Sequence, residues 1–84
     1  MKHLGYIVIE KCEEYEQPLG LVQRAGLPPG GLLEWTDGPR AVFTTRKDAW
    51  SAVERTDCYR RAFARTDLPE KKYCKVVPIK FIQP

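Results

Sequence analysis

The chain has 84 residues, of which 43% are hydrophobic and 30% are charged, and its formal net charge is +3. This composition excludes a disordered chain, and so short a chain buries only about 60% of its unfolded surface, so we expect one thin-cored domain over residues 1–84. No apolar run approaches the roughly 20 residues of a membrane-spanning helix, and none has the form of a signal peptide. We therefore expect a cytoplasmic protein without membrane contact.

The segment 5–12 predicts the first strand, because it is rich in β-branched and aromatic residues. Tyr6 and Val8 fall on one face of this strand, and Ile7 and Ile9 fall on the other. Apolar residues on both faces are typical of a central strand that is covered on two sides.

The strand is expected to leave the core at Glu10 and Lys11, and an acidic connection follows at 13–18. Charge runs of this kind favour a solvated loop. The connection places three carboxylates around one aromatic ring, in the run Glu13, Glu14, Tyr15 and Glu16.

Two further strands are expected at 19–25 and at 32–35. Between them, the sequence Gly-Leu-Pro-Pro-Gly-Gly at 26–31 predicts a loop, because proline lacks an N–H donor and glycine is flexible. After the second of these strands, Thr-Asp-Gly-Pro at 36–39 predicts a turn.

The strongest local signal is a helix start at Thr45 and Asp48, which fit the capping-box pattern. The helix is expected to run from Arg46 to about Thr56, with a possible extension to Phe63. Its apolar stripe, at helical spacing, consists of Ala49, Ala52, Val53, Thr56, Tyr59 and Phe63.

Arg60 falls inside this apolar stripe. Two interpretations are open: the helix breaks near Asp57, or the long Arg60 side chain extends outward along the edge of the core.

The last strand is expected at 73–82, and Pro78 places it at a sheet edge or at a bulge. The order strand, strand, strand, helix, strand predicts an α+β fold: a small antiparallel sheet of three to four strands with one main helix on one face. Trp50 or Val53 would then pack against the first and last strands, at Ile7, Ile9, Val77 and Ile79.

Residues suited to catalysis are sparse. His3, the one histidine, lies at a terminus where nothing holds it as a general base, and Ser51 lies within the predicted helix. The odd number of cysteines (Cys12, Cys58 and Cys74) argues against a disulfide framework, and their separated positions disfavour a zinc site. We predict reduced, mostly buried thiols, no enzymatic activity, no metal and no cofactor.

Positive charge gathers in the second part of the chain: residues 1–37 carry a net −3 and residues 38–84 a net +6. The predicted helix and the segment after it carry eight cations, namely Arg46, Lys47, Arg55, Arg60, Arg61, Arg65, Lys71 and Lys72. Tyr59 and Tyr73 lie near them as groups that can stack on bases. Glu54 is expected to pair with Lys47 and Arg61 on the same helix side.

Three interpretations of this basic region stay open: a solvated helix face, a contact with nucleic acid, and a contact with an acidic protein surface. Arginine is suited to bidentate contacts with phosphate or carboxylate. Lys47, Arg61 and Arg65 fall on the helix side away from the apolar stripe, and together with Arg55 they are the candidate contact residues.

Aromatic residues form the second candidate feature, because Trp and Tyr are concentrated at protein interfaces. Tyr15, in the acidic connection, is the best interface candidate. For Trp35 and Trp50 a core position is the favoured interpretation in so small a domain, and an interface role for Trp35 is the alternative.

The stretch Val-Phe-Thr-Thr-Arg-Lys-Asp-Ala at 42–49, with Tyr-Cys-Lys-Val-Val-Pro-Ile at 73–79, resembles a layout common in short phage and prophage accessory proteins. The resemblance covers about half of the chain. It implies a single-domain inhibitor of host machinery, in the class that includes anti-CRISPR proteins, acting by stoichiometric binding. This analogy assigns no role to any residue.

Our leading hypothesis is therefore a non-enzymatic binding protein, of phage or mobile-element origin, that occupies a host protein or complex. The carboxylates of Glu13, Glu14 and Glu16 would then mimic phosphate at a basic groove. The alternatives are direct nucleic-acid binding through the basic helix, and a phage accessory protein that assembles with itself or a neighbouring gene product.

Overall fold

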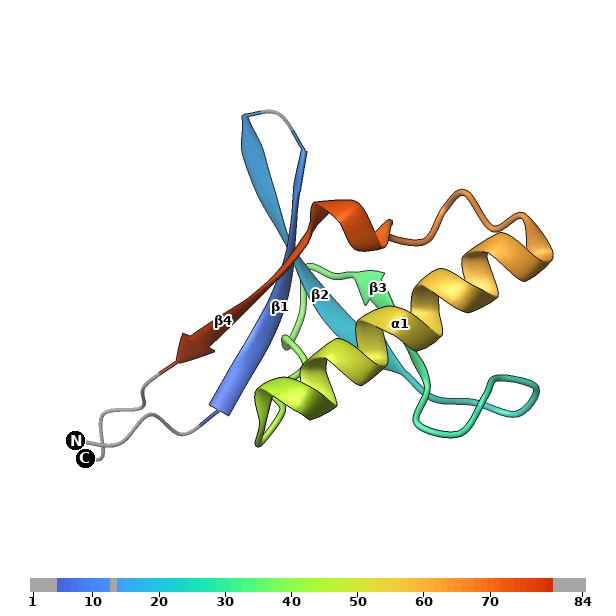
Figure 1. Cartoon of the computed structure of the whole chain (residues 1–84), viewed down its shortest axis with the longest axis horizontal. Coiled ribbons are helices and arrows are strands. Elements are labelled where there is room, and N and C mark those ends of the chain that lie inside the picture. The colour runs from blue at the N-terminus through green and yellow to red at the C-terminus, as the bar shows by residue number, and fades with distance from the viewer. Residues whose placement is uncertain (1–4, 13, 80–84) are drawn as a thin grey trace.

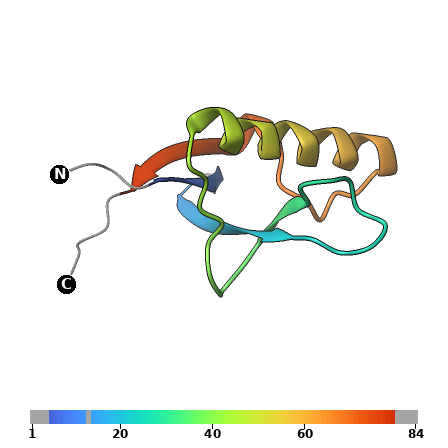
Figure 2. The ribbon, with the colours of Figure 1, turned by 90° about the horizontal axis from the view of Figure 1, so that it is seen from below.

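A computed structural model describes residues 5–12 and 14–79 of the chain. The elements in order are β1 (Gly5–Cys12), β2 (Tyr15–Val22), β3 (Leu32–Trp35), α1 (Arg46–Phe63), the short 3₁₀ helix η1 (Lys71–Tyr73) and β4 (Cys74–Ile79). The strands pair antiparallel in the order β3-β2-β1-β4, and α1 lies across one face of the sheet (Figures 1 and 2). The predicted α+β fold class and element order are confirmed.

Strand β2 changes partner along its length. Its first half, 15–18, pairs with β1, and its second half, 19–22, pairs with β3. The gap that opens beside the start of β1 is filled by the chain before α1, where Tyr6 and Phe43 exchange two backbone hydrogen bonds of 2.8 Å. The end of β1 and the start of β2 project from the sheet as a two-stranded arm (Figure 1).

The prediction of a solvated loop at 13–18 is wrong for its second half, because Tyr15–Pro18 forms part of β2. Glu14 lies in the turn of the hairpin, and Glu13 lies outside the described residues. Cross-strand pairing with β1 stabilises this arm, while its side chains are largely exposed. A strand of this kind shows no alternation of apolar and polar residues, which is the signal on which the prediction depends.

The core lies between the sheet and α1. Val8, Leu19 and Leu33 are each 0% exposed and contribute the strand side of this core. The helix contributes mainly small residues, at Ala49, Ala52 and Val53. Two alanines on the buried stripe permit the helix axis to approach the strands closely, which suits a core with few large side chains.

The predicted packing of Ile7, Ile9, Val77 and Ile79 against the helix is wrong. Val8 packs with α1, as do Val76 and Cys74, which belong to the opposite face of their strands. Because β1 is apolar on both faces, its sequence does not indicate which face the helix covers. Its predicted central position is confirmed, and both Ile7 and Val8 are buried.

The helix begins at Arg46 as predicted, but among the described hydrogen bonds only the Thr45 half of the expected capping box forms. The hydroxyl oxygen of Thr45 accepts a hydrogen bond of 3.0 Å from the backbone N–H of Asp48. The carboxylate of Asp48 accepts at 3.3 Å from the hydroxyl of Thr44, one residue before the cap. The first bond satisfies one of the backbone N–H groups that the first turn leaves without a partner, and the second joins two side chains beside it.

The helix does not break near Asp57 but continues to Phe63, and Ala64 ends it in the left-handed conformation at φ 52°. Arg60 follows the second interpretation: its guanidinium reaches out of the stripe and donates 3.0 Å to the carbonyl of Leu68. The apolar stripe ends earlier than predicted, because Phe63 is 64% exposed. The last turn of α1 thus extends beyond the sheet.

The outer edge of β3 is covered by α1. The buried hydroxyl of Thr56 accepts a hydrogen bond of 2.9 Å from the N–H of Leu33 and donates one of 2.8 Å to the carbonyl of Ala52. A side chain of the apolar stripe therefore supplies the acceptor for the Leu33 N–H at this strand edge.

Strand β4 begins one residue later than predicted, and its predicted end is not tested. It covers Cys74–Ile79, Tyr73 belongs to η1, and residues 80–82 lie outside the described residues. It forms the other edge of the sheet, as Pro78 predicts. Pro78 has no N–H to offer a further strand, so this edge is a poor template for sheet extension.

Candidate functional site

The structure places three sequence candidates near one another: Tyr15 and Glu16 on the projecting arm, and Trp35 beside the base of the arm. Tyr15 and Trp35 line a hollow of about 300 Å³ together with Gln17, and Trp35, Glu16 and Gln17 line a second hollow of about 400 Å³ together with Asp37. Gln17 and Trp35 belong to both hollows, so the surface is continuous. We call it the acidic–aromatic edge. Tyr15, Glu16, Trp35 and Asp37 line its hollows, and we include Glu14, the exposed turn residue next to Tyr15.

Both aromatic rings of this edge face solvent. Tyr15 is 60% exposed and Trp35 is 41% exposed. The core position favoured for Trp35 and Trp50 is wrong, because Trp50 is also 37% exposed. Each of these rings stands at the margin of the sheet-helix core, where a domain of this size lacks the depth to enclose an indole.

The Trp35 ring is held in place by a buried carboxylate. Its indole N–H donates a hydrogen bond of 2.6 Å to Glu10, which is 5% exposed, although the sequence predicted an exit to solvent there. The second oxygen of Glu10 accepts from the backbone N–H of Glu70 at 2.9 Å. Because its N–H is already used, Trp35 offers a partner an apolar ring rather than a donor.

The carboxylates of the edge are free of internal cations. Within 5–12 and 14–79, Glu14, Glu16 and Asp37 form no ion pair. Lys11 lies opposite Glu16 in the β1–β2 register, but no ion pair joins them. Negative charge at this edge is therefore available to a partner. The sequence does not indicate a binding role for Asp37, because Asp37-Gly38 is typical of a turn.

Arg55, a candidate contact residue, is used inside the molecule. Its guanidinium donates 2.7 Å to the carbonyl of Gly31 and 3.0 Å to that of Gly30. These bonds tie the loop before β3 to α1. Arg55 therefore acts first as a clamp on this loop.

Arg61 and Arg65 are also engaged. Arg61 pairs with Asp57 at 3.1 Å on the same helix face. Arg65 lies beyond the end of α1, contrary to its predicted helical position, and makes two bonds of 2.8 Å to Asp67. This bidentate hydrogen bond lowers the pKa of Asp67 from 3.8 to about 2, and the pKa of Arg65 is raised in turn.

The predicted pairing of Glu54 with Lys47 and Arg61 is wrong. Glu54 pairs with Lys71 of η1, and Lys47 is exposed without an ion pair among the described residues. Five cations of the basic region have carboxylate partners: Arg60, Arg61, Arg65, Lys71 and Lys72. The basic candidates are thus dispersed and largely neutralised.

The thiols differ in environment. Cys58 is exposed, contrary to prediction, and Cys74 is buried with its Sγ 3.3 Å from the carbonyl of Glu70. The surroundings of Cys12 lie outside the described side chains. Within the described ranges, no group of three or more His, Cys, Asp and Glu side chains is arranged to hold a metal ion.

Comparisons of the chain with protein-family models, with curated proteins and with solved structures each find no match. The described ranges contain no helix with the length and apolar character needed to cross a membrane. The resemblance to short phage proteins therefore gains no support from these comparisons, and the site must be interpreted from its own geometry.

Proposed function

We propose that this protein is a non-enzymatic binding protein, and that the acidic–aromatic edge occupies a basic surface of a host protein or complex. One observation carries the proposal: two exposed aromatic rings line adjoining hollows with Glu16 and Asp37, and exposed Glu14 lies in the turn next to Tyr15. These three carboxylates form no ion pair among the described residues. Aromatic anchors such as Trp and Tyr are concentrated in binding hot spots, and a polar rim usually surrounds them.

The electrostatics favour this edge over the basic helix. Arg61 and Arg65 each pair with a carboxylate, so the helix face as a whole carries little uncompensated positive charge. A basic partner at the edge meets exposed carboxylates that form no ion pair with any described residue. Complementary charge of this kind accelerates association and selects the partner.

A partner that normally binds nucleic acid fits this chemistry best, since carboxylates on a projecting arm present negative charge as a phosphate backbone does. The resemblance to phage and prophage inhibitors, with the anti-CRISPR class among them, suggests that such binding blocks host machinery. Inhibition and phage origin are accordingly parts of the same proposal.

The test is capture of partners from host lysate by the tagged, full-length protein, after nuclease treatment, with mass spectrometry. A variant carrying Glu14→Gln and Glu16→Gln loses two negative charges at the edge. A matched control, Gln23→Lys with Ser51→Lys, shifts the net charge equally at exposed positions elsewhere. We expect one protein or complex, recovered near-stoichiometrically with the wild type and control and lost with the edge variant.

Equal recovery with all three proteins would contradict the proposed surface. Recovery that disappears on nuclease treatment would instead favour the second candidate, nucleic-acid binding. That alternative has one observation in its favour, the hollow between α1 and η1 that Trp50 and four cations line.

A further inference from the structure

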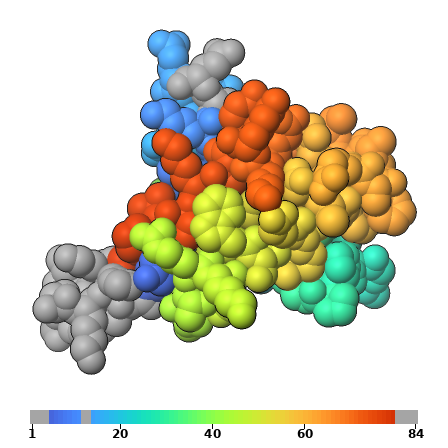
Figure 3. Space-filling view, in the orientation of Figure 1, coloured from blue at the N-terminus to red at the C-terminus, as the bar shows by residue number. Residues whose placement is uncertain are grey.

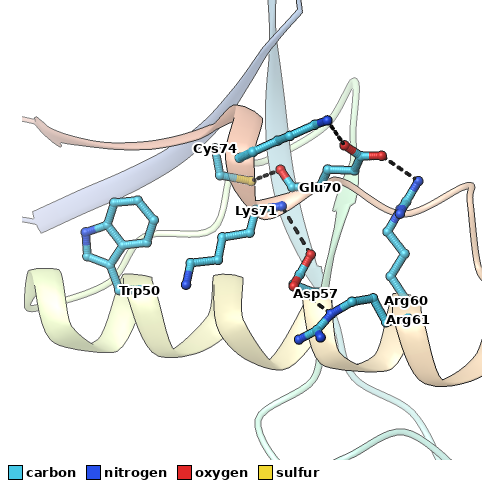
Figure 4. A pocket seen from close by; sticks show the side chains of 8 residues that line it. Trp50, Asp57, Arg60, Arg61, Glu70, Lys71 and Cys74 are labelled. Carbon is cyan, nitrogen blue, oxygen red and sulfur yellow. Dashed lines mark hydrogen bonds and ion pairs between the residues drawn. The ribbon is translucent and has the colours of Figure 1, made fainter.

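A hollow of about 620 Å³ lies between α1 and the segment that carries η1 and the start of β4. These elements lie side by side on one face of the molecule (Figure 3), and Figure 4 shows the side chains around the hollow. Its volume falls within the roughly 300–1,000 Å³ typical of small-molecule sites. No residue of the acidic–aromatic edge lines it.

One end of the hollow is formed by an aromatic ring. Trp50 projects from α1 beside Lys71 and Cys74, away from the Arg60–Glu70 pair (Figure 4). The ring is 37% exposed. An exposed indole at the wall of a cavity offers a stacking platform for a planar ligand.

The rim is predominantly positive. Four cations line it (Arg60, Arg61, Lys71 and Lys72), against the two carboxylates of Asp57 and Glu70. Two more cations, Arg46 and Lys47, lie one helical turn before Trp50 and form no ion pair among the described residues. Arg46 instead lies over the neutral ring of Tyr6, 5.0 Å from its centroid, so its positive charge is not cancelled.

The ion pairs at the rim are exchangeable. Arg61 and Lys72 have side chains 67% and 69% exposed, and Lys72 lies 3.6 Å from Glu70. Lys71 pairs with Glu54, which does not line the hollow, and these two side chains are 46% and 56% exposed. Exposed pairs of this kind contribute little to stability, so an anionic ligand can replace one of them. Phosphate is a stronger competitor than a carboxylate for lysine and arginine, because it carries more charge and more acceptor oxygens.

We propose that this hollow binds a nucleotide unit, with the nucleobase stacked on Trp50 and the phosphate held by Lys71 and Arg61. The ligand is either a free nucleotide or one unit of a single strand, since both present the same base and phosphate. In a strand, neighbouring phosphates would reach Arg46 and Lys47 along α1. This site is independent of the proposed protein partner.

The test follows the indole N–H and backbone amide resonances of the ¹⁵N-labelled full chain during titration. The probes are a nucleoside monophosphate, inorganic phosphate, and a short oligothymidylate. The nucleotide should shift the Trp50 indole and Lys71 amide resonances saturably, and inorganic phosphate alone should bind more weakly. The Trp50 signal is identified as the one that disappears in Trp50→Leu.

The variants separate the two halves of the site. Trp50→Leu should weaken nucleotide binding by about 5- to 150-fold, the equivalent of ~1–3 kcal/mol for one base stack. Lys71→Gln should weaken it and reduce its salt dependence. Lys75→Gln, on the opposite face of β4 from Cys74, should change nothing. Dispersed amide spectra of each variant confirm that it is folded.

Tighter and more salt-dependent binding of the oligothymidylate than of the mononucleotide identifies a strand as the source, and equal binding identifies a free nucleotide. Both results support the site. It is overturned if no probe shifts the Trp50 resonance at millimolar concentration. It is also overturned if phosphate binds as tightly as the nucleotide and Trp50→Leu has no effect.

Discussion

The indole N–H of Trp35 donates a hydrogen bond of 2.6 Å to the carboxylate of Glu10, 25 residues earlier in the chain. The other oxygen of the same carboxylate accepts the backbone N–H of Glu70 at 2.9 Å. A single buried side chain thus joins the first strand, the third strand and the segment before β4. It also fixes the ring at the centre of the acidic–aromatic edge.

Glu10→Gln should destabilise the protein and release Trp35. Glutamine keeps one acceptor oxygen, so one of the two donors meets an amide NH₂ and stays unsatisfied, which costs about 1–3 kcal/mol. Urea unfolding measures the loss, and the Trp35 indole resonance should move in the folded variant. Glu16→Gln, at the exposed edge, is the control and should stay within about 0.5 kcal/mol of the wild type. Equal stabilities would contradict the role of Glu10.

Thr56→Val should cost about 1–3 kcal/mol of unfolding free energy, because it removes the acceptor of the buried Leu33 N–H while nearly preserving the side-chain volume. Chemical denaturation measures this loss. Hydrogen exchange at Leu33 should quicken more than at Val8, in the centre of the sheet. An unchanged exchange rate at Leu33 would show that the strand edge does not depend on Thr56.

The Asp67 carboxyl should titrate with a pKa of about 2, below its ordinary value of 3.8, because Arg65 donates two hydrogen bonds to the charged carboxylate. A lowered folded-state pKa means that the pair stabilises the fold above pH 3.8 and loses that contribution as the pH falls toward 2. The carboxyl ¹³C chemical shift of Asp67 measures the midpoint. Arg65→Gln should return it toward 3.8. A wild-type midpoint already at that value would rule out the pair in solution.

Gly31→Ala should destabilise the loop before β3 more than Gly26→Ala. Both glycines have positive φ, 80° and 92° respectively, so both substitutions carry the left-handed backbone cost of about 1–2 kcal/mol. A Cβ at Gly31 would also clash with the carbonyl oxygen of Val22, whereas a Cβ at Gly26 has nothing within 4 Å. The difference in unfolding free energy between the two variants isolates the clash. Equal losses of unfolding free energy in the two variants would show that the Val22 carbonyl does not lie against Gly31.

Local signals allowed much of the fold to be predicted. Strand propensity defined β1 and β3, and the cap at Thr45 defined the start of α1. The choice of sheet face failed at Val8 and Ile7, because both faces of β1 are apolar and only the helix decides between them. The same dependence on distant partners explains why Phe63 was wrongly placed in the core.

The candidate site was predictable only in part. Tyr15 and Glu16 stood out by composition, but their proximity to Trp35 depends on the change of pairing partner along β2. The burial of Glu10 depends on donors 25 and 60 residues away, which no local pattern reveals. The neutralisation of the basic candidates was partly visible, since Arg65 and Asp67 are only two residues apart.

The most direct test of the proposed function is the dissociation constant of the purified complex with the captured host partner, measured over a range of salt concentrations. The account predicts that Glu14→Gln with Glu16→Gln weakens binding and flattens its salt dependence, while Gln23→Lys with Ser51→Lys leaves both close to the wild type. Identical affinity and salt dependence in all three proteins would contradict the claim that the acidic–aromatic edge is the binding surface.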